Sequence, residues 1–177
     1  YITAKCAKLI APSLSLLTRL TFLDFGLCKL EDKGLASLAV ALAQMSHLRE
    51  LNLYGCHLTE KSAKLLAKCM ANWKLLEQLY LGDNKFKSNS IKLMMDSFGH
   101  LQSLHTLSLN TTHLDAKADK WLAKMLPLAP CLTWVDLVNN KDLLSAGLVD
   151  LKAVWDADYD FESFGIIRRK TPFVLPQ

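Results

Sequence analysis

Side chains able to bind a metal ion are few and scattered along this chain of 177 residues. Structural zinc is held by Cys and His ligands, commonly as two pairs a few residues apart. The closest histidines are His100 and His105, and neither has a cysteine or carboxylate beside it in the sequence. The sequence contains a repeating pattern, described below, and His57 and His113 occupy the same position in repeats that are two units apart. They are therefore expected about 10 Å from each other, which is too far to share a metal ion. We therefore expect no metal site.

Motifs of the common catalytic sites are missing from the sequence. It contains no G-x-x-x-x-G-K-[ST] phosphate loop, no G-x-S-x-G nucleophile turn, no H-E-x-x-H zinc helix and no dinucleotide-binding glycine fingerprint. The five cysteines form no C-x-x-C pair, so neither a zinc site nor a disulfide framework is indicated. We expect no enzyme activity, no cofactor, and reduced, buried thiols in a cytoplasmic location.

A repeated unit organises most of the chain. The pattern L-x-x-L-x-L-x-x-[NCT]-x-L occurs five times at constant spacing, beginning at Leu20, Leu48, Leu76, Leu104 and Leu132. Apolar residues at helical spacing follow each pattern and recur with the same period, and the fifth unit carries one extra residue near Lys141. The strand-like and helix-like spacings predict a short strand followed by a helix in every unit.

This repeat resembles that of the leucine-rich repeat family, in particular its ribonuclease-inhibitor-like class with long, 28-residue units. The resemblance implies an α/β solenoid forming a horseshoe segment, with a parallel β-sheet on the concave face and α-helices on the convex face. Residues 1–155 are expected to form this solenoid, as a half repeat (1–19) followed by the five full repeats. Residues 156–177 lack the pattern and are expected to form a C-terminal cap or an irregular tail.

The leucine alternation predicts which strand residues face the core. Successive strand side chains point to opposite faces, so Leu51 and Leu53 are expected inside and Asn52 outside. The ninth position of each unit is expected to form a ladder of buried small side chains that bond the turning backbone: Cys28, Cys56, Asn84, Thr112 and Asn140. Residues with side-chain oxygens are expected to cap the helix N-termini: Asp32, Thr59, Ser88, Asp115 and Ser145.

The outward strand positions form the candidate binding surface. The core does not require them, yet aromatic residues occupy several of them among polar and acidic neighbours, as in many protein-binding surfaces. We call these residues the concave set: Phe22, Asp24, Glu50, Asn52, Tyr54, Gln78, Tyr80, Trp134 and Asp136. Asp24 and Asp136 lie four repeats and thus about 19 Å apart, too far for an acid–base pair. Tyr54 and Tyr80 are expected to form one contiguous patch.

Charge and hydropathy argue against two classes of partner. The chain has 21 Lys and Arg against 17 Asp and Glu, a net charge of +4, which is only mildly basic. No apolar run reaches the roughly 18 residues that cross a bilayer. Lys61, Lys64 and Lys68 follow helical spacing without interleaved aromatic residues, so they are expected to form a solvated ridge rather than a single-strand nucleic-acid platform. We expect neither a nucleic acid nor a membrane as partner.

These observations predict a non-catalytic protein–protein recognition module that uses the concave sheet face. The family resemblance implies a fragment of a larger intracellular receptor, such as an innate immune sensor of the NOD-like type, or of an effector, with possible contacts to domains upstream of the first helix. Two alternatives stay open: a GTPase-activating protein, which is also known in the family, and a purely structural spacer. Arg19 and Arg49 are the arginines of the repeat region and lie on no loop after a strand, which disfavours the first alternative.

Overall fold

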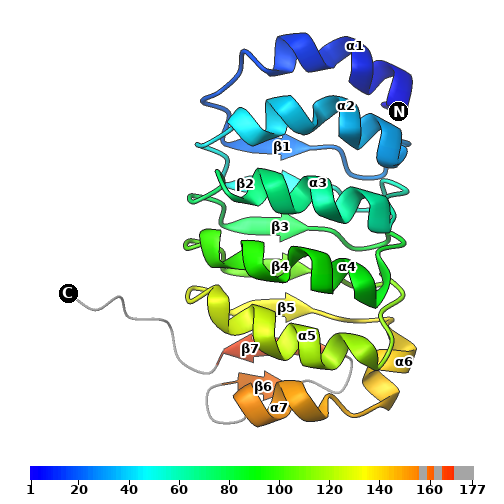
Figure 1. Cartoon of the computed structure of the whole chain (residues 1–177), viewed down its shortest axis with the longest axis vertical. Coiled ribbons are helices and arrows are strands. Elements are labelled where there is room, and N and C mark those ends of the chain that lie inside the picture. The colour runs from blue at the N-terminus through cyan, green and yellow to red at the C-terminus, as the bar shows by residue number, and fades with distance from the viewer. Residues whose placement is uncertain (156–158, 162–164, 170–177) are drawn as a thin grey trace, which may run out of the picture.

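Strands and helices alternate along the chain and stack as two layers, with the helices in front of the sheet in Figure 1. The computed structural model describes residues 1–155, 159–161 and 165–169. Its helices are α1 (Ala4–Leu14), α2 (Glu31–Gln44), α3 (Glu60–Met70), α4 (Lys87–Met94), α5 (Lys117–Met125), α6 (Lys141–Ser145) and α7 (Val149–Trp155). Short 3₁₀ segments, η1 (Met95–His100) and η2 (Leu126–Leu128), extend α4 and α5.

Each full repeat contributes one three-residue strand to a single sheet. These strands are β1 (Phe22–Asp24), β2 (Glu50–Asn52), β3 (Gln78–Tyr80), β4 (Thr106–Ser108) and β5 (Trp134–Asp136). They pair in parallel, and each residue lies opposite its equivalent in the next repeat. The predicted fold class, a leucine-rich-repeat solenoid with a parallel sheet and a helical layer, is confirmed.

The core lies between the two layers and follows the predicted periods. Leu51 and Leu53 are fully buried, whereas Asn52 between them is half-buried on the opposite face, as the leucine alternation predicts. The helix column that recurs once in every repeat is fully buried as well: Leu38, Leu66, Met94 and Leu122. Burial of each leucine side chain contributes about 2 kcal/mol, so the repeated leucines supply the main favourable term of folding.

Burial weakens at the N-terminal end of the stack. Within the described residues, β1 pairs with no strand but β2, and α2 is the one helix that packs against α1. Leu23 of β1 is therefore half-buried, in contrast to its fully buried equivalents Leu51 and Leu79. Leu9, Leu16 and Leu17 of the first half repeat are exposed.

Two further strands extend the sheet at the C-terminal end: β6 (Tyr159–Phe161) and β7 (Ile166–Arg169). β7 pairs antiparallel with β5, and β6 pairs antiparallel with β7. Both strands fall within residues 156–177, for which a cap or irregular tail is expected. Residues 156–158, 162–164 and 170–177 of that segment lie outside the described residues.

A buried carboxylate on α5 holds the N-terminus of α7. Asp119 is almost fully buried, and its two oxygens accept hydrogen bonds from the backbone amides of Asp150 (2.8 Å) and Leu151 (3.0 Å). These amides belong to the first helical turn and have no partner within the helix. Asp119 thus takes the capping role that was predicted for Ser145, which instead ends α6. The extra residue of the fifth repeat, near Lys141, lies at the start of α6, a short helix that has no equivalent in the other repeats.

The predicted capping bonds form in alternate repeats. The Thr59 hydroxyl accepts a hydrogen bond from the Lys61 amide, and Asp115 accepts one from the amide of Lys117, the first residue of α5. Asp32 and Ser88 are not caps, because α2 and α4 begin one residue earlier, at Glu31 and Lys87, whose φ angles are 55° and 59°.

Asp32 and Ser88 instead join neighbouring repeats. Asp32 accepts hydrogen bonds from the Thr59 amide (2.9 Å), the Thr59 hydroxyl (2.7 Å) and the Ser62 hydroxyl (2.6 Å) of the next repeat. The Ser88 hydroxyl donates to Asp115 (2.7 Å) in the equivalent place. Because these hydrogen bonds recur every second repeat, the true structural period of the loops is a pair of repeats.

The ladder residues tie the strand ends together, as predicted. The buried Asn84 amide group donates to the carbonyls of Leu53 (2.8 Å) and Leu81 (2.9 Å), and its oxygen accepts from the Leu58 amide (2.9 Å). Asn140 makes the same set of bonds two repeats later, to Leu109, Leu137 and Leu114. Cys28, at the edge of the sheet, differs from the prediction because it is only half-buried.

The five cysteines are free thiols that fall into two classes. Cys56 and Cys69 are buried, and burial raises the pKa of Cys56 to about 12 and that of Cys69 to about 11. Cys6, Cys28 and Cys131 are half-buried, so the expectation of uniformly buried thiols is wrong. A hydrogen bond from the Thr3 hydroxyl lowers the pKa of Cys6.

Leu53→Asp is expected to unfold several repeats together. The variant loses about 2 kcal/mol of apolar burial and adds a larger desolvation term for an unpaired carboxylate, and neighbouring repeats depend on each other. Circular dichroism during heating measures the loss. Asn52→Asp, which places the same residue one position away on the outward face, is the control and keeps the native melting temperature. Equal melting of the two variants would show that the assigned strand faces are wrong.

Asn84→Ala is expected to lower the free energy of unfolding by about 2 to 4 kcal/mol, because it leaves several buried backbone groups without partners. Urea unfolding followed by circular dichroism measures this value. Asn89→Ala on the exposed face of α4 is the control and is expected to leave stability unchanged or slightly increased. A loss for Asn84→Ala as small as that of the control would argue against the ladder as a source of stability.

Thiol alkylation is expected to proceed in two phases. The thiolate is the reactive form, so burial and a raised pKa should protect Cys56 and Cys69, while Cys6 should react first. Mass spectrometry after timed alkylation at neutral pH identifies the modified sites, and alkylation in denaturant provides the control in which all five react. Rapid native labelling of Cys56 would contradict its burial.

Candidate functional site

The sheet register brings most of the concave set into two rows across the strands. One row contains Phe22, Glu50, Gln78, Thr106, Trp134 and Arg168, and each residue lies opposite the next. The second row contains Asp24, Asn52, Tyr80, Ser108, Asp136 and Ile166. Arg168, on β7, lies opposite Trp134, a neighbour that the repeat pattern does not predict. Phe22 and Asp24 are exposed, and the other members of the concave set are half-buried.

Tyr80 is the most constrained aromatic residue of this surface. Its hydroxyl donates a hydrogen bond to the Gln78 side-chain oxygen (2.5 Å), two residues earlier on β3. Partial burial, and secondarily the negative charge of Glu50, raise the pKa of Tyr80. The side chain therefore leans toward the beginning of β3, whereas Tyr54 follows the end of β2. The structure thus joins Tyr80 to Gln78, and the contiguous patch with Tyr54 stays a prediction.

Three polar members of the concave set also shape the backbone at the strand ends. A side-chain oxygen of Asp24, Asn52 or Asp136 accepts a hydrogen bond from the amide two residues later, at 2.6, 2.9 and 2.9 Å. These are Asx turns, in which Asp or Asn bonds its own chain and reverses its direction. The sequence analysis assigned these three residues to the binding surface only. Their hydrogen bonds show that they also stabilise the turns that follow the strands. Partial burial raises the pKa of Asp136.

Three charged or titratable residues that the sequence analysis did not bring together lie just before consecutive strands. Arg49 and Glu77 form an ion pair between adjacent repeats, and the His105 Nε2 lies 3.8 Å from a second Glu77 oxygen. Their shared place in consecutive repeats, with alternating charge, is the signal that would have found them. His105 therefore has a carboxylate beside it in space, although none is near in sequence.

The concave face carries more negative than positive charge. The ion pairs found among the described residues both involve Glu77. Asp24, Glu50 and Asp136 therefore have no ion-pair partner within the described part of the chain. Glu50 lies opposite Gln78 on the neighbouring strand, whereas Asp24 and Asp136 each lie two strands, or about 10 Å, from Tyr80. Carboxylates at a partly desolvated surface favour cationic groups on a ligand.

His57 and His113 line one hollow at the loop edge of the solenoid, together with Asp83 and Asn84. Lys85, midway between the two histidines in the repeat register, lines the same hollow. Its ammonium group disfavours a bound cation. Within residues 1–155 and the described parts of β6 and β7, no cluster of three His, Cys, Asp or Glu side chains could hold a metal ion.

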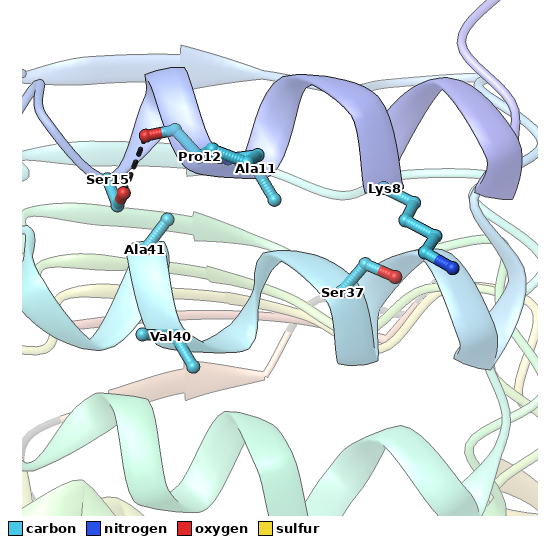
Figure 2. A pocket seen from close by; sticks show the side chains of 7 residues that line it. All are labelled: Lys8, Ala11, Pro12, Ser15, Ser37, Val40 and Ala41. Carbon is cyan, nitrogen blue, oxygen red and sulfur yellow. Dashed lines mark hydrogen bonds between the residues drawn. The ribbon is translucent and has the colours of Figure 1, made fainter.

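A second hollow lies between α1 and α2 (Figure 2). Its walls are mostly small side chains, among them Ala11 and Ala41. The hydroxyl of Ser15 donates to the Pro12 carbonyl (2.7 Å) and that of Ser37 to the Lys33 carbonyl (3.1 Å), so both are bonded to their own helix. This hollow offers shape but little polar chemistry for a ligand.

The helices of the solenoid are short relative to a bilayer. Among the helices of the described residues, none combines the length and the apolar character that crossing a bilayer requires.

Comparison with known proteins identifies the repeat and the fold. Residues 47–69 match the model of the Leucine Rich Repeat family. The structure is similar to that of leiomodin-1 actin-binding site 2, with a TM-score of 0.64 and 14% sequence identity over 85% of this chain and 88% of that chain. It is also similar to the tropomodulin C-terminal domain of Caenorhabditis elegans, with a TM-score of 0.64 and 13% identity over 88% of this chain and 95% of that chain.

No curated protein matches the chain in sequence. At 13 to 14% identity, the structural likeness establishes the fold and not the partner. The chain is folded as a leucine-rich-repeat solenoid, one unit of which also matches the family model in sequence.

Proposed function

We propose that the chain is a non-catalytic protein-recognition module whose concave set receives the partner. The observation that carries this proposal is Tyr80, a half-buried aromatic side chain held by Gln78 on a face whose carboxylates Asp24, Glu50 and Asp136 have no ion-pair partner among the described residues. Aromatic anchors in a polar surround are typical of binding hot spots. Phe22 and Trp134 lie on the first and last of the five parallel strands, in the row that contains Gln78, and widen the apolar contact.

The charge of the concave face supports a partner that presents Lys or Arg side chains. Asp136 is half-buried, its pKa is raised by burial, and it forms no ion pair with a described residue. A cation from the partner would supply a compensating charge and would add directional hydrogen bonds. Arg49 cannot serve this purpose, because it already pairs with Glu77.

The setting proposed for this module is a larger intracellular receptor or effector in the cytoplasm. Support comes from the repeat period, which resembles that of the ribonuclease-inhibitor-like class and of the sensor regions of NOD-like receptors. The exposed leucines Leu9, Leu16 and Leu17 offer a surface for an intramolecular contact with upstream domains. Actin is a first partner to test, since it is named for the similar leiomodin-1 structure.

Tyr80→Ala is expected to weaken partner binding by about 2 kcal/mol, or about 30-fold in Kd, as truncation of a hot-spot aromatic residue commonly does. Stability should barely change, because the ring lies outside the core. Partners are identified by crosslinking the native protein in cell extract and are then purified, and actin is tested in parallel. Calorimetric titration of the native chain and the variant measures Kd.

The double variant Lys64→Glu, Lys68→Glu on α3 is the control for this experiment. It is expected to leave Kd for the concave partner nearly unchanged, apart from a salt-sensitive change in association rate. Loss of binding in the lysine variant with an unaffected Tyr80→Ala would move the recognition surface to the helices. A structural spacer would give no specific crosslink, and a GTPase-activating protein would accelerate GTP hydrolysis by a GTPase from a purified panel.

A further inference from the structure

The helices opposite the concave face carry a dense group of lysines. α3, α4 and α5 contain eight exposed lysines: Lys61, Lys64, Lys68, Lys87, Lys92, Lys117, Lys120 and Lys124. Glu60 and Asp119 are the acidic residues of these three helices, and Asp119 is buried against α7. We call the eight lysines and Trp121 the convex lysine face.

The lysines form an ordered array because the repeat fixes their positions. Lys64, Lys92 and Lys120 occupy the same place in consecutive repeats, one on each of three helices that lie side by side in Figure 1. Lys68 and Lys124 lie one helical turn further along α3 and α5, and the exposed Asp96 of η1 occupies the equivalent position in the repeat between them. Neighbouring helix axes are about 8 to 10 Å apart, and residues four apart on one helix are about 6 Å apart. The lysines therefore form a grid of positive charges in which one position is acidic, Asp96.

The grid is densest around one indole ring. The ammonium nitrogens of Lys120, Lys92 and Lys124 lie 4.7, 5.4 and 5.5 Å from the centroid of the half-buried Trp121 ring. A ring face attracts cations, but three like charges around a single ring also repel one another. None of the three forms an ion pair with a described residue. An anionic ligand between the three lysines would relieve this repulsion.

We propose that the convex lysine face binds a carboxylate-rich polypeptide segment, with Trp121 and its three lysines as the centre of the contact. Carboxylates on the partner would lie between the lysine rows and would neutralise the cluster around the ring. This surface is separate from the concave set, since the sheet and the core lie between them. The inference therefore goes beyond the proposed function and does not depend on it.

The composition of the face favours a polypeptide over a membrane or a nucleic acid. Interfacial helices insert large apolar side chains into the bilayer, and the exposed large apolar residues of the described chain all lie outside α3, α4 and α5. Phosphate recognition is best served by the bidentate arginine fork, and single strands need several stacking aromatic residues. These three helices contain no arginine and one aromatic residue, Trp121.

The test measures binding of a short fluorescein-labelled oligoglutamate peptide to the whole chain by fluorescence anisotropy. The triple variant Lys92→Glu, Lys120→Glu, Lys124→Glu is expected to weaken binding at least about tenfold, because three attractive contacts become repulsive. The matched control is Lys29→Glu, Lys33→Glu, Lys141→Glu, which changes the net charge equally at exposed positions outside the face. The control is expected to change affinity by about twofold through long-range attraction alone. Circular dichroism verifies that both variants are folded.

Three results would overturn the proposal. Failure of the native chain to bind oligoglutamate would remove the site, and equal losses in the two triple variants would show a response to net charge instead of a defined face. Tighter binding of a DNA duplex, or of phosphatidylcholine–phosphatidylserine vesicles, at the same salt concentration would assign the face to another class of partner. Tyr80→Ala is expected to leave oligoglutamate affinity unchanged, so failure here is distinguishable from failure of the concave-set proposal.

Discussion

A single repeat of this protein cannot bury its own leucines, and the rest of the structure depends on this constraint. Leu51 and Leu53 reach zero exposure because strands and helices of the neighbouring repeats cover them, whereas Leu23 at the edge of the sheet stays half-buried. Stacking in one register is the arrangement that covers every repeat in the same way. The ladder bonds of Asn84 and Asn140 then satisfy the backbone groups that stacking would otherwise leave unpaired.

The period made most of the fold predictable, because strand parity and helical spacing follow directly from the positions of the leucines. The start of each helix was less predictable. Asp32 and Ser88 have the residue types of N-caps, yet a left-handed residue before each of them starts the helix early and turns their side chains toward the next repeat. The loops instead follow a period of two repeats. Thr59 and Asp115 occupy equivalent positions two repeats apart and indicate this period, but the single-repeat pattern of the leucines is stronger and hides it.

The candidate site was predicted in its position but not in its contacts. The alternation of strand side chains between the two faces places Tyr80 and Glu50 on the outward face. The hydrogen bond that holds Tyr80 to Gln78 depends on the side-chain rotamers, which the repeat pattern does not specify. The pairing of Arg49 with Glu77 was missed since both precede their strands, where the leucine pattern says nothing of side-chain direction. Arg168 next to Trp134 comes from an antiparallel strand outside the repeats. The two layers also separate charge, with carboxylates on the sheet and lysines on the helices, because neither outward face is constrained by the core.

The alternating loops have a consequence for how the length of such a solenoid can change. The bonds from Asp32 to Thr59 and Ser62 join one kind of repeat to the other, and so do those between Ser88 and Asp115. Excision of one repeat would bring two repeats of the same kind together and would leave a carboxylate or an amide without its counterpart. Excision or duplication of two consecutive repeats would keep the alternation of the two kinds. The unit by which the length of this solenoid changes with least disturbance is therefore the pair of repeats, provided that a carboxylate of one repeat still meets a hydroxyl of the next.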